Sequence, residues 1–405
     1  MDKLQQFILE NEAADSARLI LSKEKYPEID INLAINIIES RKKIRKKLPS
    51  WYDKPELIFP FKLSAEQSSS ESTSAYKANI AQKLGLESIA DLTGGMGVDS
   101  WAFSRIAKEV FYNEMQPELA AATEKNFKIF GLDNVRFSSV KLYEGNIDDI
   151  LSNRTPDLIF LDPARRADSG KKVFRLEDCQ PDVLTLREHL LKKSKYLMIK
   201  LSPMADIDMI LRGLGTECKE VHIISQTGEC KEVLVLMERA WQGGTQIIAA
   251  DLDRDFTLKF TKEEEMKAGC TYLQCDMDFE GRYLLEPSKA ITKAGCFKLL
   301  CLRYEFIKLA PSTHLYLIHK EQINTASKLG KIFKIKEVSN FDKKAIKKAG
   351  LNYPNSEVSA KSIPLTSDEL RKKLSVKSGN DAHIWGLGTT IGRYLLITER
   401  ITGDF

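Results

Sequence analysis

The residues with the clearest chemical meaning lie where a short apolar segment ends and a glycine-rich turn begins. Residues 89–98 read Ile-Ala-Asp-Leu-Thr-Gly-Gly-Met-Gly-Val, which predicts a strand that ends at Asp91 and a helix that starts near Val98. Glycines in such a turn let the backbone approach a ligand closely, and open α/β sheets bind ligands at the carboxyl ends of their strands. The turn alone is also compatible with a simple tight turn. The residues after the later strands therefore decide between the two interpretations.

Polar residues follow the next two predicted strands. Glu114 ends the segment 110–114 and lies 23 residues after Asp91. An acidic residue at this position can accept hydrogen bonds from the ribose hydroxyls of an adenosine-containing ligand. Asn146 follows Gly145 beyond the third strand, where it can meet an adenine edge. Glu114 could instead be the N-terminal charge of the next helix, but three strand ends in series favour the ligand.

The fourth predicted strand, residues 158–161, is followed by Asp162-Pro163-Ala164-Arg165. With this segment added, residues 64–240 resemble the class I S-adenosylmethionine-dependent methyltransferases. A closer resemblance, over nearly the whole chain, is to the bacterial methyltransferases with a C-terminal THUMP-like domain. The segments that carry this closer resemblance are residues 66–71, 162–166, 200–203, 285–294 and 367–374.

The resemblance implies an α/β fold with a doubly wound seven-stranded sheet, and S-adenosylmethionine as the cofactor. It implies that Asp91 lies near the methionine ammonium, and that Asp162 and the carbonyl after it accept hydrogen bonds from a base nitrogen. The protein then mainly aligns the nucleophile with the methyl group. The catalytic residues that it implies are Asp162, Pro163 and Arg165. The cofactor-binding residues that it implies are Asp91, Thr93, Gly94, Gly95, Gly97, Glu114, Met115, Asn146 and Asp162.

Two features of the segment after the fourth strand depart from related enzymes. Relatives that methylate amino groups usually carry an aromatic residue two positions after the proline, where this chain has Arg165. A guanidinium plane can also stack on a base or hold a phosphate. The segment resembles the D-P-P-R of RNA 5-methyluridine enzymes as well, which attack the base with a cysteine. Residues 200–203 (Lys-Leu-Ser-Pro) contain no cysteine, so methylation at C5 is disfavoured.

Basic residues follow Asp162 closely and predict an anionic substrate. We expect Arg165, Arg166, Lys171 and Arg175 to bind it, and a nucleic-acid backbone suits such a loop. Residues 311–405 carry 16 Lys and Arg against nine Asp and Glu, although the whole chain has a net charge of only +4. Such an excess indicates either a polyanion partner such as RNA or an ordinary solvated lysine surface.

The remaining pattern predicts four regions. Residues 1–62 form a helical region, and residues 63–262 form the methyltransferase domain, in which strands alternate with helices. Residues 263–330 form a small connecting domain, for which a ferredoxin-like fold is one option. Residues 331–405 form a THUMP-like α/β domain, with a capping box at Thr366 and Glu369 and a terminal hairpin. The serine-rich stretch 64–77 either closes over the cofactor or is a plain capped helix.

Composition narrows the class of protein further. Apolar residues make up 43% and charged residues 29% of 405 residues, which fits a multidomain globular protein. No apolar run approaches the roughly 18 residues of a membrane span, and the N-terminus has no signal-peptide pattern. Seven cysteines without a C-x-x-C pair fit a reducing cytoplasm. The scattered histidines predict no metal site, and the sequence leaves the oligomeric state open.

We therefore predict an S-adenosylmethionine-dependent methyltransferase that transfers a methyl group to a base nitrogen in RNA. A nicotinamide-dependent oxidoreductase would need G-x-G-x-x-G, but Ser100 stands at the last glycine position. A non-catalytic RNA-binding protein on a methyltransferase fold is the other alternative. Glu114 and Asp162 favour the enzyme, whereas Arg165 leaves this alternative open.

Overall fold

The computed structural model describes residues 3–21, 23–165 and 176–403. The chain folds as two compact units. The first consists of Met1–Glu220 and Val233–Gly244, and the second of Val221–Glu232 and Thr245–Phe405. The chain passes from one unit to the other three times, and two consecutive strands each contribute residues to both units.

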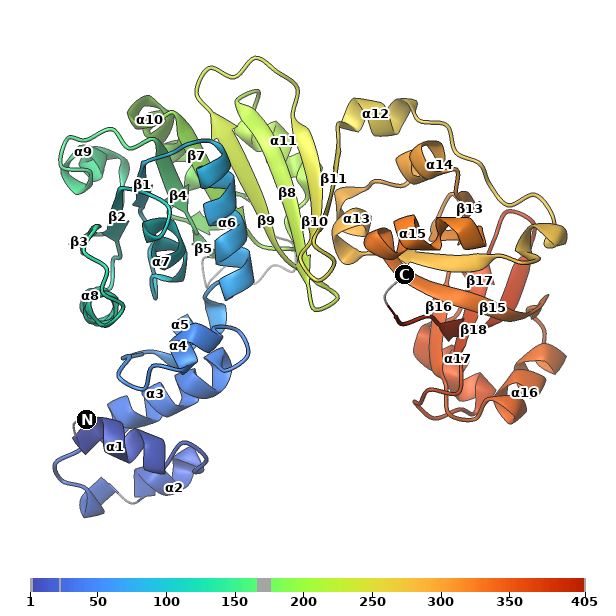
Figure 1. The fold of residues 1–405 in the computed structure, drawn as a ribbon, viewed down its shortest axis with the longest axis horizontal. Helices are drawn as coiled ribbons and strands as arrows, with labels where there is room; N and C mark the ends of the chain where they lie inside the picture. The colour runs from blue at the N-terminus through green and yellow to red at the C-terminus, as the bar shows by residue number, and fades with distance from the viewer. Residues whose placement is uncertain (1–2, 22, 166–175, 404–405) are drawn as a thin grey trace. The chain divides into compact units, whose positions relative to one another are not determined.

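The first unit begins with a group of helices that leads through α6 into the sheet (Figure 1). Asp30 starts α3 by accepting a hydrogen bond from the Leu33 N–H, and Pro117 stands in the first turn of α8. The buried Trp51 packs with ring centroids 6.1 Å from Trp101 and 5.0 Å from Phe130. The α-helices are α1 (Lys3–Glu10), α2 (Ser16–Leu21), α3 (Ile31–Ile44), α4 (Pro49–Tyr52), α5 (Lys62–Gln67), α6 (Glu71–Lys83), α7 (Val98–Ser104), α8 (Pro117–Ile129), α9 (Ile147–Ile150), α10 (Val183–Lys193) and α11 (Ile207–Leu214).

The basic run 41–47 at the end of α3 makes contacts within this helical region. Arg41 is buried and donates to the Tyr52 carbonyl, and Lys43 pairs with Glu66. Lys47 donates to the Glu66 carbonyl at the end of α5. These cations therefore join the helices to one another.

The larger sheet has the strand order β11-β10-β8-β9-β7-β4-β1-β2-β3. Its nine strands correct the expected seven, because β10 and β11 extend the edge beyond β8. Strands β3, β2, β1, β4 and β7 run parallel to one another, whereas β9 runs antiparallel to β7. The strands are β1 (Ser88–Asp91), β2 (Glu109–Asn113), β3 (Val135–Ser138), β4 (Leu158–Leu161), β7 (Tyr196–Leu201), β8 (Cys218–Gln226), β9 (Glu229–Glu238), β10 (Gln246–Asp251) and β11 (Phe256–Phe260).

The central strands are buried on both faces, as the apolar run in β4 predicts. Parallel pairing brings the carboxyl ends of β1, β2 and β4 to one edge, with Asp91 opposite Tyr112 and Phe160. The predicted strand ends therefore do meet. A separate two-stranded ribbon, β5 (Ala164–Arg165) with β6 (Cys179–Gln180), follows β4.

The second unit holds a seven-stranded sheet in the order β13-β14-β12-β15-β18-β17-β16. Its terminal hairpin and the capping box of Thr366 and Glu369 form as predicted. Its further strands are β12 (Tyr283–Pro287), β13 (Ile307–Ala310), β14 (Thr313–Ile318), β15 (Gly330–Asn340), β16 (Glu357–Lys361), β17 (His383–Gly388) and β18 (Arg393–Arg400). Its α-helices are α12 (Lys262–Lys267), α13 (Lys289–Ala294), α14 (Lys298–Tyr304), α15 (Ile323–Leu329), α16 (Lys343–Asn352) and α17 (Ser367–Leu374).

The boundary expected between residues 330 and 331 lies inside this sheet. Strand β12 pairs with β15, so the connecting region and the C-terminal region share one set of hydrogen bonds. They also share a core, in which Leu284 and Leu317 pack with Trp385 and Leu396. Between β12 and β13 the chain forms α13 and α14. None of the described helices is long and apolar enough to cross a membrane.

Candidate active site

The glycine turn after β1 has the close packing that its sequence predicts. Gly97 adopts a left-handed conformation with φ of 82°, and a Cβ there would lie 2.5 Å from the Thr123 methyl. A Cβ on Gly94 would lie 2.1 Å from the Tyr112 ring. The Gly94 N–H donates to the Asn113 carbonyl over 2.8 Å. Side chains at these two glycines would thus displace the turn from the sheet edge.

Glu114 follows β2 and turns its carboxylate back to the glycine turn. One carboxylate oxygen accepts the Gly95 N–H at 3.0 Å, and the other accepts the Gln116 N–H at 2.9 Å. The side chain is buried, yet it lines the cavity described next. Each carboxylate oxygen has a second lone pair, so Glu114 can still accept a hydrogen bond from a ligand hydroxyl.

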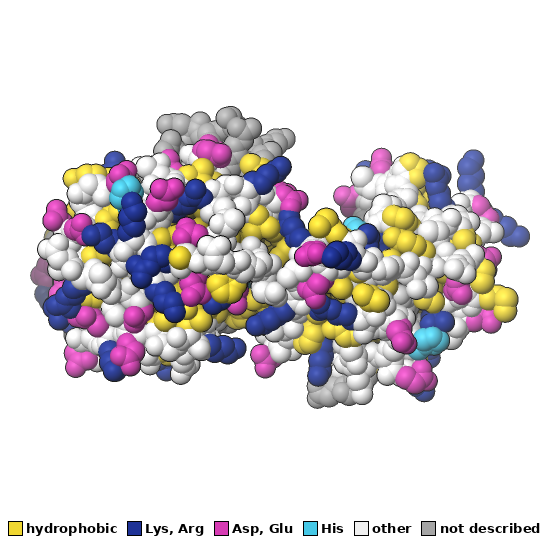
Figure 2. Space-filling model, turned by 90° about the horizontal axis from the view of Figure 1, so that it is seen from above, with side chains coloured by type: hydrophobic (Ala, Val, Ile, Leu, Met, Phe, Trp, Pro, Cys, Tyr) yellow, Lys and Arg dark blue, Asp and Glu magenta, His cyan; other side chains and the backbone are white. Residues whose placement is uncertain are grey.

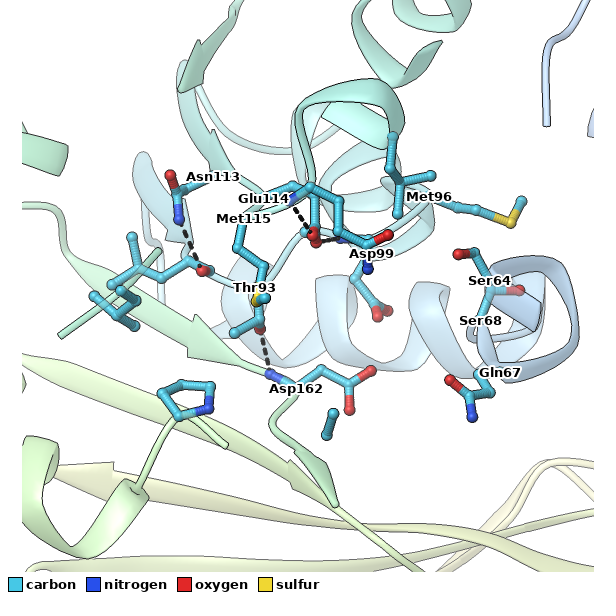
Figure 3. A pocket seen from close by; sticks show the side chains of 18 of the residues that line it. Ser64, Gln67, Ser68, Thr93, Met96, Asp99, Asn113, Glu114, Met115 and Asp162 are labelled. Carbon is cyan, nitrogen blue, oxygen red and sulfur yellow. Dashed lines mark hydrogen bonds between the residues drawn. The ribbon is translucent and has the colours of Figure 1, made fainter. Parts of the chain in front are cut away.

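A cavity with about 1050 Å³ of empty space, including the part open to solvent, lies over the ends of β1, β2 and β4. Figure 3 shows Ser64, Gln67 and Ser68, from α5 and the residue after it, together on one side of the cavity, with Glu114 and Asp162 on other sides. The predicted site residues that line it are Thr93, Gly94, Gly95, Glu114, Met115 and Asp162.

Asp162 ends β4 and is tied to two neighbouring strands. Its backbone N–H donates to the Thr93 hydroxyl over 2.6 Å (Figure 3). Its carboxylate accepts a hydrogen bond from the Lys200 ammonium, at the end of β7, over 2.5 Å. About a third of the Asp162 side chain is exposed, so it is both held and accessible. This geometry suits a group that orients or accepts a proton from a bound nucleophile.

Asp91 lies beneath the glycine turn and does not line the cavity. Its carboxylate accepts the Ser100 hydroxyl at 2.6 Å and the Thr93 N–H at 3.2 Å. Burial, together with the negative charges of Asp99 and Asp162, raises its pKa to about 8 against the lowering effect of these two hydrogen bonds. Asp91 therefore supports the glycine turn from beneath and makes no contact with the cavity.

The serine-rich stretch is both a capped helix and a wall of the cavity. Ser70 and Thr73 form a capping box that starts α6, while Ser64, Gln67, Ser68 and Ser69 line the cavity. Ser69 donates to Asp99 over 2.7 Å and accepts from the buried Lys77 over 2.9 Å. Lys77 also pairs with Asp99 over 3.0 Å. This network fixes α6 and the residue Ser69 before it to α7.

Asn146 lies outside the cavity wall. Its amide donates to the Lys141 carbonyl over 2.8 Å, and its side-chain oxygen accepts the Tyr143 N–H at 3.0 Å. These bonds hold the loop after β3, from which Val140, Lys141 and Leu142 line the cavity. The structure therefore gives Asn146 a loop-supporting position, because its amide bonds to the backbone of the loop.

The segment after Asp162 is described in part. Pro163 does not line the cavity, and the Arg165 backbone pairs with Cys179 in the β5–β6 ribbon. Arg166, Lys171 and Arg175, expected to bind substrate, lie outside the described residues. The ribbon brings Gln180 and Pro181 to the cavity beside Asp162.

Several lining residues were not anticipated from the sequence. Asn113 and Gln116 flank Glu114 and could have been included with it, but nothing local marks Gln180 or Pro181. The unanticipated residues that line the cavity are Leu92, Met96, Val98, Asp99, Asn113, Gln116, Leu119, Val140, Lys141, Leu142, Ala164, Gln180 and Pro181. Across the described ranges, no group of three His, Cys, Asp or Glu side chains could hold a metal ion.

Comparison with known families matches two regions of the second unit. A ferredoxin-like domain family matches residues 283–324, and the THUMP domain-like family matches residues 330–400. A comparison with curated proteins gave no match.

Among solved structures, the crystal structure of a putative methyltransferase from Porphyromonas gingivalis W83 is 28% identical, with a TM-score of 0.83. The match covers 99% of this chain and 98% of that one. An rRNA methylase from Streptococcus thermophilus is 16% identical over 40% of this chain and 95% of its own, with a TM-score of 0.31. A putative methyltransferase from Streptococcus mutans, in complex with SAH, is 17% identical over 40% of this chain and 96% of its own, with a TM-score of 0.30.

These findings confirm the resemblance seen in the sequence. Full-length similarity to a putative methyltransferase places the cavity in a fold shared with that protein. The family match at residues 330–400 identifies the C-terminal region. The chain is thus similar to the methyltransferases that end in a THUMP-like domain.

Proposed function

We propose that the protein is an S-adenosylmethionine-dependent methyltransferase that acts on a base nitrogen in RNA. The observation that carries the proposal is that Glu114 and Asp162 line one cavity beside a glycine turn without room for side chains. Full-length similarity to a putative methyltransferase supports it.

The cavity fits the charge and the polarity of this cofactor. Three carboxylates line it, from Asp99, Glu114 and Asp162, of which Asp99 is paired with Lys77 and Asp162 with Lys200. Such a site favours a ligand with a sulfonium and an ammonium. Glu114 would hold the ribose, and the backbone of Thr93, Gly94 and Gly95 would contact the methionine moiety.

The chain's own residues then have simple tasks. When bound, S-adenosylmethionine supplies an activated methyl group on its sulfonium. Asp162 would orient the nucleophilic nitrogen and accept its proton, and Lys200 would hold the carboxylate in place. When the transferred group is already activated, the alignment of the nucleophile with that group accounts for much of the rate enhancement.

RNA as the substrate rests on the THUMP-like match and on exposed cations in the second unit. Helix α16 exposes Lys343, Lys344, Lys347 and Lys348, of which Lys348 pairs with Glu337. On the face shown in Figure 2, however, Lys and Arg side chains lie among Asp and Glu rather than in one patch. Contacts with phosphates would therefore come from particular groups, such as the α16 lysines, rather than from a broad positive field.

The test uses RNA from a strain that lacks the gene for this protein. The purified chain is incubated with that RNA and with S-adenosylmethionine labelled in the methyl group, and digested nucleosides are identified by mass spectrometry. We expect label on a nitrogen of one base from the wild type and far less from Asp162→Asn. Cofactor binding without transfer to any RNA would instead favour the non-catalytic alternative.

A further inference from the structure

The second unit contains two cysteine thiols whose sulfur atoms nearly touch. The Sγ of Cys270 lies 2.9 Å from the Sγ of Cys301, although 31 positions separate them in the sequence. A disulfide joins its sulfurs at about 2.05 Å, so a movement of about 0.9 Å would allow a bond. Cys270 is partly exposed in the segment after α12, and Cys301 is buried in α14.

The backbone holds both cysteines in place independently of their side chains. On the Cys270 side, the Lys308 N–H donates to the Thr271 carbonyl over 2.9 Å, and the Leu273 N–H donates to the Lys308 carbonyl over 3.0 Å. Tyr272 therefore forms a parallel β-bridge with Lys308 of β13. These bonds fix the residues that directly follow Cys270 in the sequence.

Helix α14, which carries Cys301, is fixed by a carboxylate at its N-terminus. Glu265 accepts three backbone N–H groups there, from Phe297 at 3.0 Å, Lys298 at 2.7 Å and Leu299 at 3.0 Å. A carboxylate at this end of a helix satisfies unpaired donors and complements the helix dipole. Because Glu265 comes from α12, it also fixes the chain just before Cys270.

The two thiols have different access to solvent and different surroundings. Burial raises the pKa of the Cys301 thiol above its usual range, and the charge of Lys308 opposes that rise. Lys308 is itself buried and donates to the carbonyls of Ala310 and Pro311 over 2.6 and 2.7 Å. A reagent from solvent therefore reaches Cys270 first, and the buried Cys301 is the second thiol to react.

We propose that Cys270 and Cys301 are a site of reversible oxidation, at which a small-molecule disulfide converts the two thiols into an intramolecular disulfide. The Cys270 thiolate attacks one sulfur of the reagent, whose S–S bond breaks and releases one thiol. Cys301 then attacks the Cys270 sulfur of the mixed disulfide and releases the second thiol. The protein loses two electrons and two protons, and the reagent gains both as two free thiols.

Such a bond would be reversible and would join two elements of one unit. In a reducing compartment the pair rests as thiols and forms a disulfide when the ratio of oxidised to reduced small thiols rises. The bond would tie α14 to the segment after α12 and so restrict the unfolded chain. This inference does not depend on the proposed methyltransferase activity.

The experiment treats the full chain with oxidised glutathione at graded ratios to reduced glutathione. Samples are quenched in acid, alkylated and digested with trypsin for mass spectrometry without reduction. The peptide 268–282 carries both Cys270 and Cys275, and the peptide 299–303 carries Cys301. Because Cys275 is exposed and lies in the same peptide, Cys275→Ser is the matched control.

We expect the two peptides to be joined, at the mass of two hydrogens less than their sum, in the wild type and in Cys275→Ser. The link should be lost in Cys270→Ser and in Cys301→Ala, with circular dichroism confirming that both variants are folded. Oxidation should also raise the thermal midpoint of the wild type and leave that of Cys270→Ser unchanged. A link through Cys275, a stable glutathione adduct on Cys270 or unreacted thiols under the most oxidising condition would overturn the proposal.

Discussion

Replacing Glu114 with alanine tests the assignment on which the cofactor proposal depends most. The side chain is buried, accepts hydrogen bonds from Gly95 and Gln116, and lines the cavity. Alanine removes the carboxylate that would hold the ribose hydroxyls. It also removes the acceptor that keeps the Gly95 N–H, and with it the glycine turn, in position.

The size of the effect follows from the kind of bond that is lost. A hydrogen bond to a charged group contributes about 1.5–3 kcal/mol. Affinity for S-adenosylmethionine should therefore fall by about 10- to 150-fold, since about 1.4 kcal/mol corresponds to a factor of ten. The free energy of unfolding should fall as well, by about 1–2 kcal/mol, because two backbone donors lose their acceptor while the cavity lets water replace part of it.

Calorimetric titration with S-adenosylmethionine and with S-adenosylhomocysteine measures the affinity. Glu118→Ala is the matched control, because it makes the same charge change four positions away, on an exposed side chain of α8. Glu114→Gln keeps one acceptor oxygen but faces an amide N–H₂ toward a backbone N–H, so its affinity should lie between the wild type and Glu114→Ala. If Glu114→Ala is folded and binds the cofactor as tightly as Glu118→Ala does, Glu114 does not hold the ribose.

Four further results are expected. Asp162→Asn should keep cofactor affinity and lose methyl transfer by about 10²-fold or more, the scale of a positioned acid–base group, as measured by single-turnover assays. Lys200→Met should reduce the same rate by a smaller factor, because Asp162 remains but is no longer held. Asp91 binds a proton in the folded chain up to about pH 8 that the unfolded chain releases near its ordinary pKa of 3.8. The free energy of unfolding should therefore fall by up to about 1.4 kcal/mol per pH unit between these values, relative to Asp91→Asn in urea titrations, and equal slopes would contradict this assignment. Glutamine in place of the exposed lysines of α16 should weaken RNA binding and reduce its salt dependence in filter-binding assays, while cofactor affinity stays constant.

The features of the site that could be predicted are those formed by residues close together in the sequence. A strand, a turn and a helix start within ten residues of one another around Gly94, and parallel pairing brings the ends of such strands to one edge. Glu114 and Asp162 were predicted because each directly follows a strand. Asn146 shows where this reasoning stops, because a polar residue in the right loop can bond to its own backbone instead.

The rest depended on contacts between distant segments, which local patterns do not encode. Lys200 could not be assigned to Asp162 before the neighbouring positions of β4 and β7 were known. The larger sheet has nine strands because β10 and β11 pair beyond β8, and the sequence pattern did not indicate that these two strands belong to the sheet. The pairing of β12 with β15 across residue 330 could not be foreseen from the change in pattern at that point.

The serine-rich stretch shows how burial can override composition. Residues 64–74 have the composition of a linker, yet Lys77 beside them has no exposed surface. A buried ammonium is stable only when it is paired and hydrogen-bonded. Asp99 supplies the opposite charge, and Ser69 joins both groups with a hydroxyl small enough to fit between them. The buried ion pair between Lys77 and Asp99 therefore explains why position 69 is a serine. This pair holds α6 against α7, so the segment is ordered although its composition is typical of a linker.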